Sequence, residues 1–111
     1  MTRRYGVIVT PEAEAGIVAA FQYILERSPL NAEKWLRTLY KKIDSLEQMP
    51  ERCPLARENE YFEDTLRHLV FKSNRIIFRI DEAKRSVQVL YVRHAKQRAV
   101  GEPIDDDTGE E

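Results

Sequence analysis

The sequence predicts an α+β domain: an N-terminal strand, a two-helix antiparallel hairpin, then a three-stranded antiparallel meander that completes a four-stranded sheet. Three observations carry this prediction: a β-rich run at residues 5–10, two amphipathic segments that follow it, and three strand-like runs between residues 65 and 94. Helices and strands that are segregated along a chain, rather than alternating, favour helices packed on one face of a sheet.

The first strand and the first helix meet at Thr10. Residues 5–10 are Y-G-V-I-V-T, a β-rich run that Pro11 ends. Thr10, Pro11 and Glu12 are typical of a helix start, because they supply a capping hydroxyl, a first-turn proline and an early acid. Through residues 11–27 one apolar stripe recurs every three or four positions: Ala13, Ile17, Ala20, Phe21, Ile24 and Leu25.

The second helix follows almost at once, since Ser28-Pro29 breaks the first helix and can cap the next. Two helices joined by so few residues are expected to pack as an antiparallel hairpin. The apolar stripe of the second helix is Ala32, Trp35, Leu36, Leu39, Ile43 and Leu46.

The C-terminal half predicts a loop and three strands. Residues 49–60 contain two prolines, and their apolar residues follow neither the helical nor the strand period, which indicates a loop. Strands are expected at 65–71, 75–80 and 86–94, joined by short polar connections. The last strand, with V-Q-V-L-Y-V at its centre, is apolar on both faces and is therefore expected near the middle of the sheet.

Length and composition limit the class of protein. A chain of 111 residues forms one domain; we assign residues 1–98 to it and 99–111 to an acidic, disordered tail. No apolar run could span a bilayer or serve as a signal peptide, and the single cysteine, Cys53, cannot form an internal disulfide, so we expect a cytoplasmic protein without a membrane partner. Two histidines and one cysteine give no plausible zinc set, and no phosphate-binding glycine loop occurs, so no metal or cofactor is expected.

Charge is distributed unevenly along the chain. Residues 65–98 hold nine Lys or Arg but only two acidic residues, whereas the last ten residues hold six acidic residues and no basic one. So basic a sheet suggests a surface that meets an anionic partner. The candidate anion- or target-binding residues are Arg67, Arg75, Arg79, Arg93 and Lys96.

Cleavage of RNA, which the family resemblance given next implies for one branch, is one chemistry that such a surface could support. It needs a base for the 2′-hydroxyl, cations for the phosphorane and an acid for the leaving oxygen. His94, with Arg75 and Arg93, is the best catalytic candidate, and His68 is the second choice. The alternatives are ordinary: solvated strand arginines, arginines paired with acids of the same domain, and a strand-end histidine bonded to backbone. Tyr91 lies in an apolar run and is expected in the core.

The chain resembles the RelE/ParE superfamily of toxins from type II toxin–antitoxin pairs. The resemblance covers about residues 5–98 and depends on the order and spacing of short motifs. These are T-P-E-A-E after the first strand, Ser28-Pro29, P-E-R-C-P-L-A, L-R-H-L-V-F, N-R-I-I-F-R-I-D and V-L-Y-V-R-H-A-K.

The resemblance implies a small toxin that forms a hetero-oligomer with a cognate antitoxin, whose extended segment wraps around it. The RelE-like branch cleaves messenger RNA on the ribosome with a basic cluster and a Tyr or His, whereas the ParE-like branch lacks that cluster and poisons DNA gyrase. This chain has no Tyr after His94, and residues 57–64 are mostly acidic, so the ParE-like branch is favoured. A RelE-like endoribonuclease and a non-toxic binding module of the same fold remain alternatives.

The acidic C-terminus also has two interpretations. A like-charged run that cannot bury much surface is most simply a solubilising terminus. Alternatively, it folds back on the basic sheet and competes there with the partner.

Overall fold

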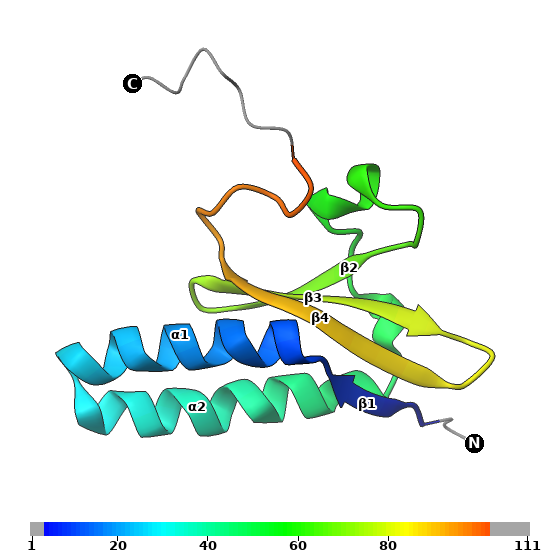
Figure 1. Ribbon diagram of the computed structural model, residues 1–111. Helices are drawn as coiled ribbons and strands as arrows, with labels where there is room; N and C mark the ends of the chain where they lie inside the picture. The colour runs from blue at the N-terminus through cyan, green and yellow to red at the C-terminus, as the bar shows by residue number, and fades with distance from the viewer. Residues whose placement is uncertain (1–3, 103–111) are drawn as a thin grey trace, which may run out of the picture.

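The four strands form one mixed sheet in the order β1-β4-β3-β2, and two helices lie on one of its faces (Figure 1). The structure is a computed structural model that describes residues 4–102. The strands are β1 (Gly6–Val9), β2 (Arg67–Phe71), β3 (Asn74–Asp81) and β4 (Ser86–His94), and the helices are α1 (Pro11–Arg27) and α2 (Pro29–Asp44). The predicted fold class and element order are confirmed.

Strand β4 lies at the centre of the sheet, as its two apolar faces predicted. It pairs in parallel with β1 and antiparallel with β3, which in turn pairs antiparallel with β2. The register of β3 and β4 shifts between Ile77 and Phe78, so that Ile77 lies opposite Tyr91 and Phe78 lies opposite Val89. Because paired residues share a face, Arg75 and Arg93 lie on one face, and Asn74 and His94 on the other.

The main core lies between the helices and the sheet. Ala13 and Ile17 of α1 and Trp35, Leu39 and Ile43 of α2 pack there against the apolar residues of β3 and β4. The predicted stripes are confirmed apart from Leu25, which is 41% exposed. Leu25 belongs to the last turn of α1, and the last turns of this helix extend beyond the strand ends (Figure 1).

The opposite face of the sheet is covered by irregular segments. The segment predicted as a loop contains the 3₁₀ helices η2 (Pro50–Arg52) and η3 (Arg57–Tyr61), and η1 (Ser45–Glu47) extends α2. A second small core of Ala56, Leu66 and Ile77 lies beneath them, with Phe62, Leu90 and Tyr91 packed against it.

The packed domain also extends further than predicted. Ala99 is 4% exposed and the Val100 N–H donates to Glu58, so residues 99–102 belong to the domain. The remainder of the predicted tail, residues 103–111, lies outside the described residues. Within the described part of the chain, no helix has both the length and the apolar character needed to cross a membrane.

Candidate functional site

Arg75, the central arginine of the predicted basic surface, is buried. Its side chain is 4% exposed and meets the fully buried Glu58 of η3, with two guanidinium N–H groups donating to the two carboxylate oxygens at 2.8 and 2.7 Å. The Val100 backbone N–H donates to the same carboxylate at 3.0 Å. Burial alone raises the pKa of Glu58, but the hydrogen bonds from Arg75 and Val100 and the Arg75 charge outweigh it and lower the pKa to about 2.

The arginines next to Arg75 are also engaged within the domain. Arg79 donates to Gln88 at 2.6 Å and lies within 4 Å of the carboxylates of Asp64 and Asp81. Arg67 donates to the Cys53 carbonyl at 2.6 Å. The predicted single exposed cationic patch is therefore not formed. Glu58 and Asp64 of the covering segments pair with Arg75 and Arg79, whereas Arg67 lies opposite Phe78 and so belongs to the other face of the sheet.

The two histidines lie in different environments. His68, on β2, accepts a long contact from Arg75 at 3.5 Å through Nδ1. Burial first, and then the Arg75 charge, lower the pKa of His68, so the ring stays neutral near pH 7. His94 is exposed at the end of β4, and its Nδ1 accepts the Lys96 backbone N–H at 3.1 Å. The Nδ1 of His94 is therefore engaged by the backbone, and Nε2 is the ring nitrogen left for an outside contact.

The three residues proposed for catalysis are not gathered in one place. Arg75 is buried under η3, and the strand alternation places His94 on the helix side of the sheet, away from Arg75 and Arg93. Tyr91 is partly buried and packs against the second core, as predicted.

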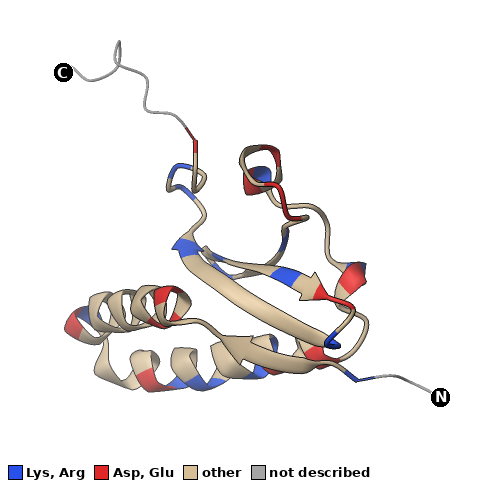
Figure 2. Ribbon diagram, turned by 45° about the vertical axis from the view of Figure 1, so that its right-hand side comes forward, with Lys and Arg blue, Asp and Glu red and all other residues tan. Residues whose placement is uncertain are grey.

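Arg93 and Lys96 instead lie in a second cationic cluster, which we call the cationic turn. It consists of residues 93–98 together with Arg57. Arg57 donates to the carbonyls of Ala95 and Gln97 at 3.3 and 3.2 Å, and Arg93 donates to the Arg98 carbonyl at 2.6 Å. Figure 2 shows the basic residues at the end of β4 and along the turn that follows it.

The charge of the cationic turn is not neutralised by the described part of the chain. Among residues 4–102, no carboxylate forms an ion pair with its four basic side chains, which are Arg57, Arg93, Lys96 and Arg98. Sequence reasoning missed Arg57, which lies in a mostly acidic stretch, and Arg98, which follows the last strand. Neither residue belongs to a periodic segment, so no pattern could have placed it.

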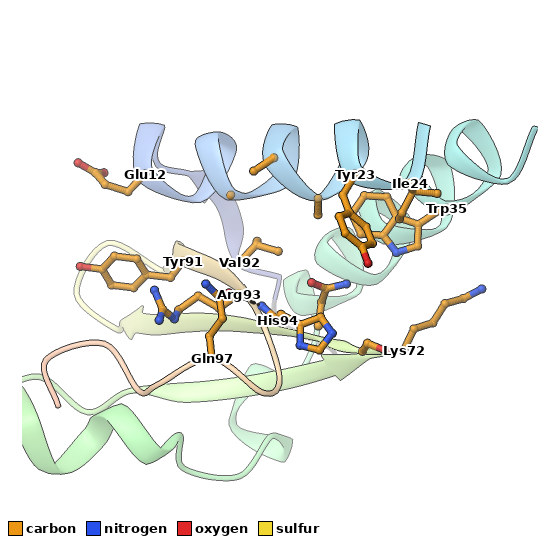
Figure 3. Close-up of a pocket in the computed structure, with 15 residues that line it drawn as sticks. Glu12, Tyr23, Ile24, Trp35, Lys72, Tyr91, Val92, Arg93, His94 and Gln97 are labelled. Atoms are coloured by element: carbon orange, nitrogen blue, oxygen red, sulfur yellow. Dashed lines mark hydrogen bonds between the residues drawn. The ribbon is translucent and has the colours of Figure 1, made fainter. Parts of the chain in front are cut away.

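A groove between α1 and β4 adjoins the cationic turn. Its volume is about 760 Å³. Gly16, Ala19 and Ala20 of α1 form one side, and Trp35 and Val92 contribute apolar surface. Figure 3 shows Tyr23, Ile24 and Trp35 projecting from the helices, with Val92 pointing toward α1. We call this feature the α1–β4 groove.

The two ends of the groove differ in charge. Glu12 lies at one end and Lys72 at the other, and Arg93, His94 and Gln97 lie along the sheet side between them (Figure 3). Tyr23 is 60% exposed on the rim, and the Arg27 guanidinium stacks 3.6 Å from the centre of its ring. An exposed aromatic rim over an apolar groove, with cations at one end, suits a peptide segment better than a small charged molecule. Among residues 4–102, no three His, Cys, Asp or Glu side chains gather into a potential metal site.

Comparison with known proteins identifies the family. The fold is similar to that of a solved structure described as the chromosomal ParDE TA system from P. aeruginosa, with a TM-score of 0.69 and 18% identity over 84% of this chain and 98% of that chain. It is also similar to the toxin–antitoxin complex RelBE2 from Mycobacterium tuberculosis, with a TM-score of 0.59 and 22% identity over 85% of this chain and 95% of that one. No curated protein sequence matches the chain. The family model described as "ParE toxin of type II toxin-antitoxin system, parDE" matches residues 7–99, and the chain therefore belongs to the ParE toxin family.

Proposed function

We propose that this protein is a toxin that inhibits DNA gyrase and that a cognate antitoxin neutralises it by placing an apolar segment in the α1–β4 groove. Family membership supports the toxin role. One observation favours gyrase over messenger RNA as the target: carboxylates of the same domain pair with the sheet arginines Arg75 and Arg79. A ribonuclease needs free cations and a proton acceptor on one surface, whereas here Arg75 is neutralised by Glu58 and His94 lies on the opposite face of the sheet.

The groove supports a peptide as the antitoxin element. Its small α1 residues leave room for large apolar side chains, which supply most of the affinity at protein interfaces when they fill such grooves. The basic end at Lys72 and the cationic turn would favour a segment that carries acidic residues beside its apolar anchors. Charge complementarity then fixes the direction in which the segment lies.

The target is tested by expressing the chain without an antitoxin. We expect growth to stop and DNA-damage signalling to rise while messages stay intact, and we expect the purified protein to inhibit supercoiling by gyrase. Messages cut near the ribosomal A site, with normal supercoiling, would instead establish the RelE-like alternative. Unchanged growth and normal supercoiling would favour the non-toxic binding module.

The groove is tested by filling it. Ala19 is exposed and lines the groove, so Ala19→Trp places an indole in the space without entering the core. We expect affinity for the cognate antitoxin to fall by about 100-fold, the effect of losing one or two anchor side chains. Titration calorimetry measures this loss, and co-expression shows whether the antitoxin still rescues growth.

The matched control for the groove is Ala15→Trp. Ala15 is exposed on the same helix but does not line the groove, so the control should bind within about twofold of wild type. Equal affinity for wild type and both variants would place the antitoxin elsewhere. The supercoiling assay does not involve the antitoxin and keeps the two halves of the proposal separate.

A further inference from the structure

The cationic turn differs from the arginines of β3 and of the β3–β4 turn. Arg75 and Arg79 are paired with carboxylates of the domain, and Arg85 lies beside Glu82. By contrast, among residues 4–102 no carboxylate forms an ion pair with the basic side chains of the cationic turn, and Arg57 and Arg93 donate hydrogen bonds only to backbone carbonyls. The guanidinium groups of Arg57 and Arg93 are thus oriented by the turn, while their charge is left for another ligand.

The described chain ends close to this cluster and in a fixed position. Ala99 is buried, and the Val100 N–H is held by Glu58. Gly101, with φ of +87°, lies so close to Tyr61 and Phe62 that a side chain there would crowd both. The Glu102 carboxylate accepts the Ala99 N–H at 3.0 Å. Whatever follows Glu102 therefore starts from an anchored point, four positions after Arg98.

The sequence that follows is complementary in charge to the cationic turn. Residues 103–111 are P-I-D-D-D-T-G-E-E, with five acidic side chains and no basic one. An extended chain spans roughly 3.3 Å per residue, so Asp105 to Asp107 lie at most about 10–17 Å from Glu102. By the same limit Arg98, four positions before Glu102, lies at most about 13 Å from it, so the two spans are comparable.

We propose that the cationic turn is a binding surface for acidic peptides and that its resident ligand is this chain's own C-terminal segment, residues 103–111. An incoming acidic segment of a partner must displace this segment before it reaches the basic end of the α1–β4 groove. The role as a competitor rests on the proposed function, whereas the binding of the C-terminal segment does not.

Physical chemistry makes this contact reversible. Exposed ion pairs are individually weak and are screened by salt, but tethering supplies the segment at an effective concentration in the millimolar range. We expect about two thirds to nine tenths of the molecules to be in the bound form at low salt. Another ligand then binds only the fraction of molecules whose surface is free, and its apparent affinity falls by that fraction. We expect about a three- to tenfold reduction at low salt.

A spin label tests the contact directly. With Cys53→Ala as background, a nitroxide on Thr108→Cys should broaden the backbone amide signals of Arg57 and of residues 93–98 in the full chain. The amides of Lys34 and Lys41, on the outer side of α2, serve as the internal control. The broadening should disappear at about 0.5 M salt, where screening is strong, and when Asp105 to Asp107 are changed to Asn. Uniform broadening, or none at the cationic turn, would overturn the proposal.

A binding measurement tests the competition with a defined probe, fluorescein-labelled octaglutamate. The chain cut after Glu102 should bind the probe about three- to tenfold more tightly than the full chain at low salt, with the difference lost at high salt. Lys96→Glu with Arg98→Glu should abolish binding to both forms, whereas Lys34→Glu with Lys41→Glu should not. Equal binding by full and cut chains would overturn the competition. Because neither experiment involves gyrase or an antitoxin, their outcome is independent of the supercoiling assay.

Discussion

Glu58→Gln is expected to lower the free energy of unfolding by about 3–5 kcal/mol, the usual effect of removing one partner from a buried ion pair. The variant keeps the shape of the side chain but leaves the Arg75 guanidinium, 4% exposed, without a counter-charge. The Arg75 Nε already has no hydrogen-bond partner, so no other group compensates for the loss. Urea denaturation followed by circular dichroism measures the change, with Glu60→Gln, an exposed carboxylate in the same 3₁₀ helix, as the control.

The stability difference should depend on pH in a defined direction. The folded-state pKa of Glu58 is about 2, below the ordinary value of about 4.3 for an unfolded chain. A carboxylate whose pKa is lower in the folded state stabilises the protein at every pH above its unfolded-state pKa. This contribution is lost as the pH falls through the folded-state pKa. The free energy of unfolding of wild type should therefore exceed that of Glu58→Gln by a constant amount from about pH 8 to about pH 5. The difference should shrink between about pH 4 and pH 2.

Two results would contradict this account of Glu58. One is an unfolding midpoint for Glu58→Gln equal to that of wild type, and the other is a difference that grows in acid. Glu58→Leu combined with Arg75→Met separates the ion pair from simple packing, because an apolar pair of similar size should restore most of the lost stability. Since Glu58 also holds Val100, the single variant should loosen residues 95–102 and with them the cationic turn.

The fold could be predicted from the sequence because the residues that each helix or strand buries form an apolar pattern within that element. The helix stripe from Ala13 to Ile24 and the two apolar faces of β4 both record contact with the core, and the structure confirms them. Thr10 illustrates the same point at one residue. Its hydroxyl accepts the Ala13 N–H as a helix cap and also donates to the Val89 carbonyl, so one side chain ends a strand and starts a helix.

The candidate site could be predicted only in part, because strand alternation gives the face of an arginine but not its partner. Alternation along β3 puts Arg75 on the face away from the helices, but its partner Glu58 lies 17 residues earlier in a segment with no periodicity. The acidic stretch at residues 57–64, which argued against a ribonuclease, also supplies Glu58 and Asp64 to the sheet arginines. The α1–β4 groove had one signal in the sequence: Gly16, which lies in a predicted helix interior where glycine costs about 1 kcal/mol relative to alanine.

That glycine leads to the second large effect: Gly16→Ala is expected to destabilise the protein by about 1–3 kcal/mol, as overpacking in a filled core does. In an exposed helix the same change would stabilise by about 1 kcal/mol. Here the sign reverses because a Cβ at residue 16 would overlap the backbone carbonyl of Val92. The carbonyl belongs to the central strand and cannot rotate away as a flexible side chain could.

Gly6→Ala is the matched control for Gly16→Ala, since a Cβ at Gly6 meets no atom within 4 Å. Thermal or urea denaturation should show a large loss for the first variant and little change for the control. If Gly16→Ala were as stable as wild type, α1 could move away from β4 at little cost, and the groove between them would not be a preformed site. If the loss is observed, close contact of α1 with β4 is what sets the width of the groove, and antitoxin affinity should fall together with stability.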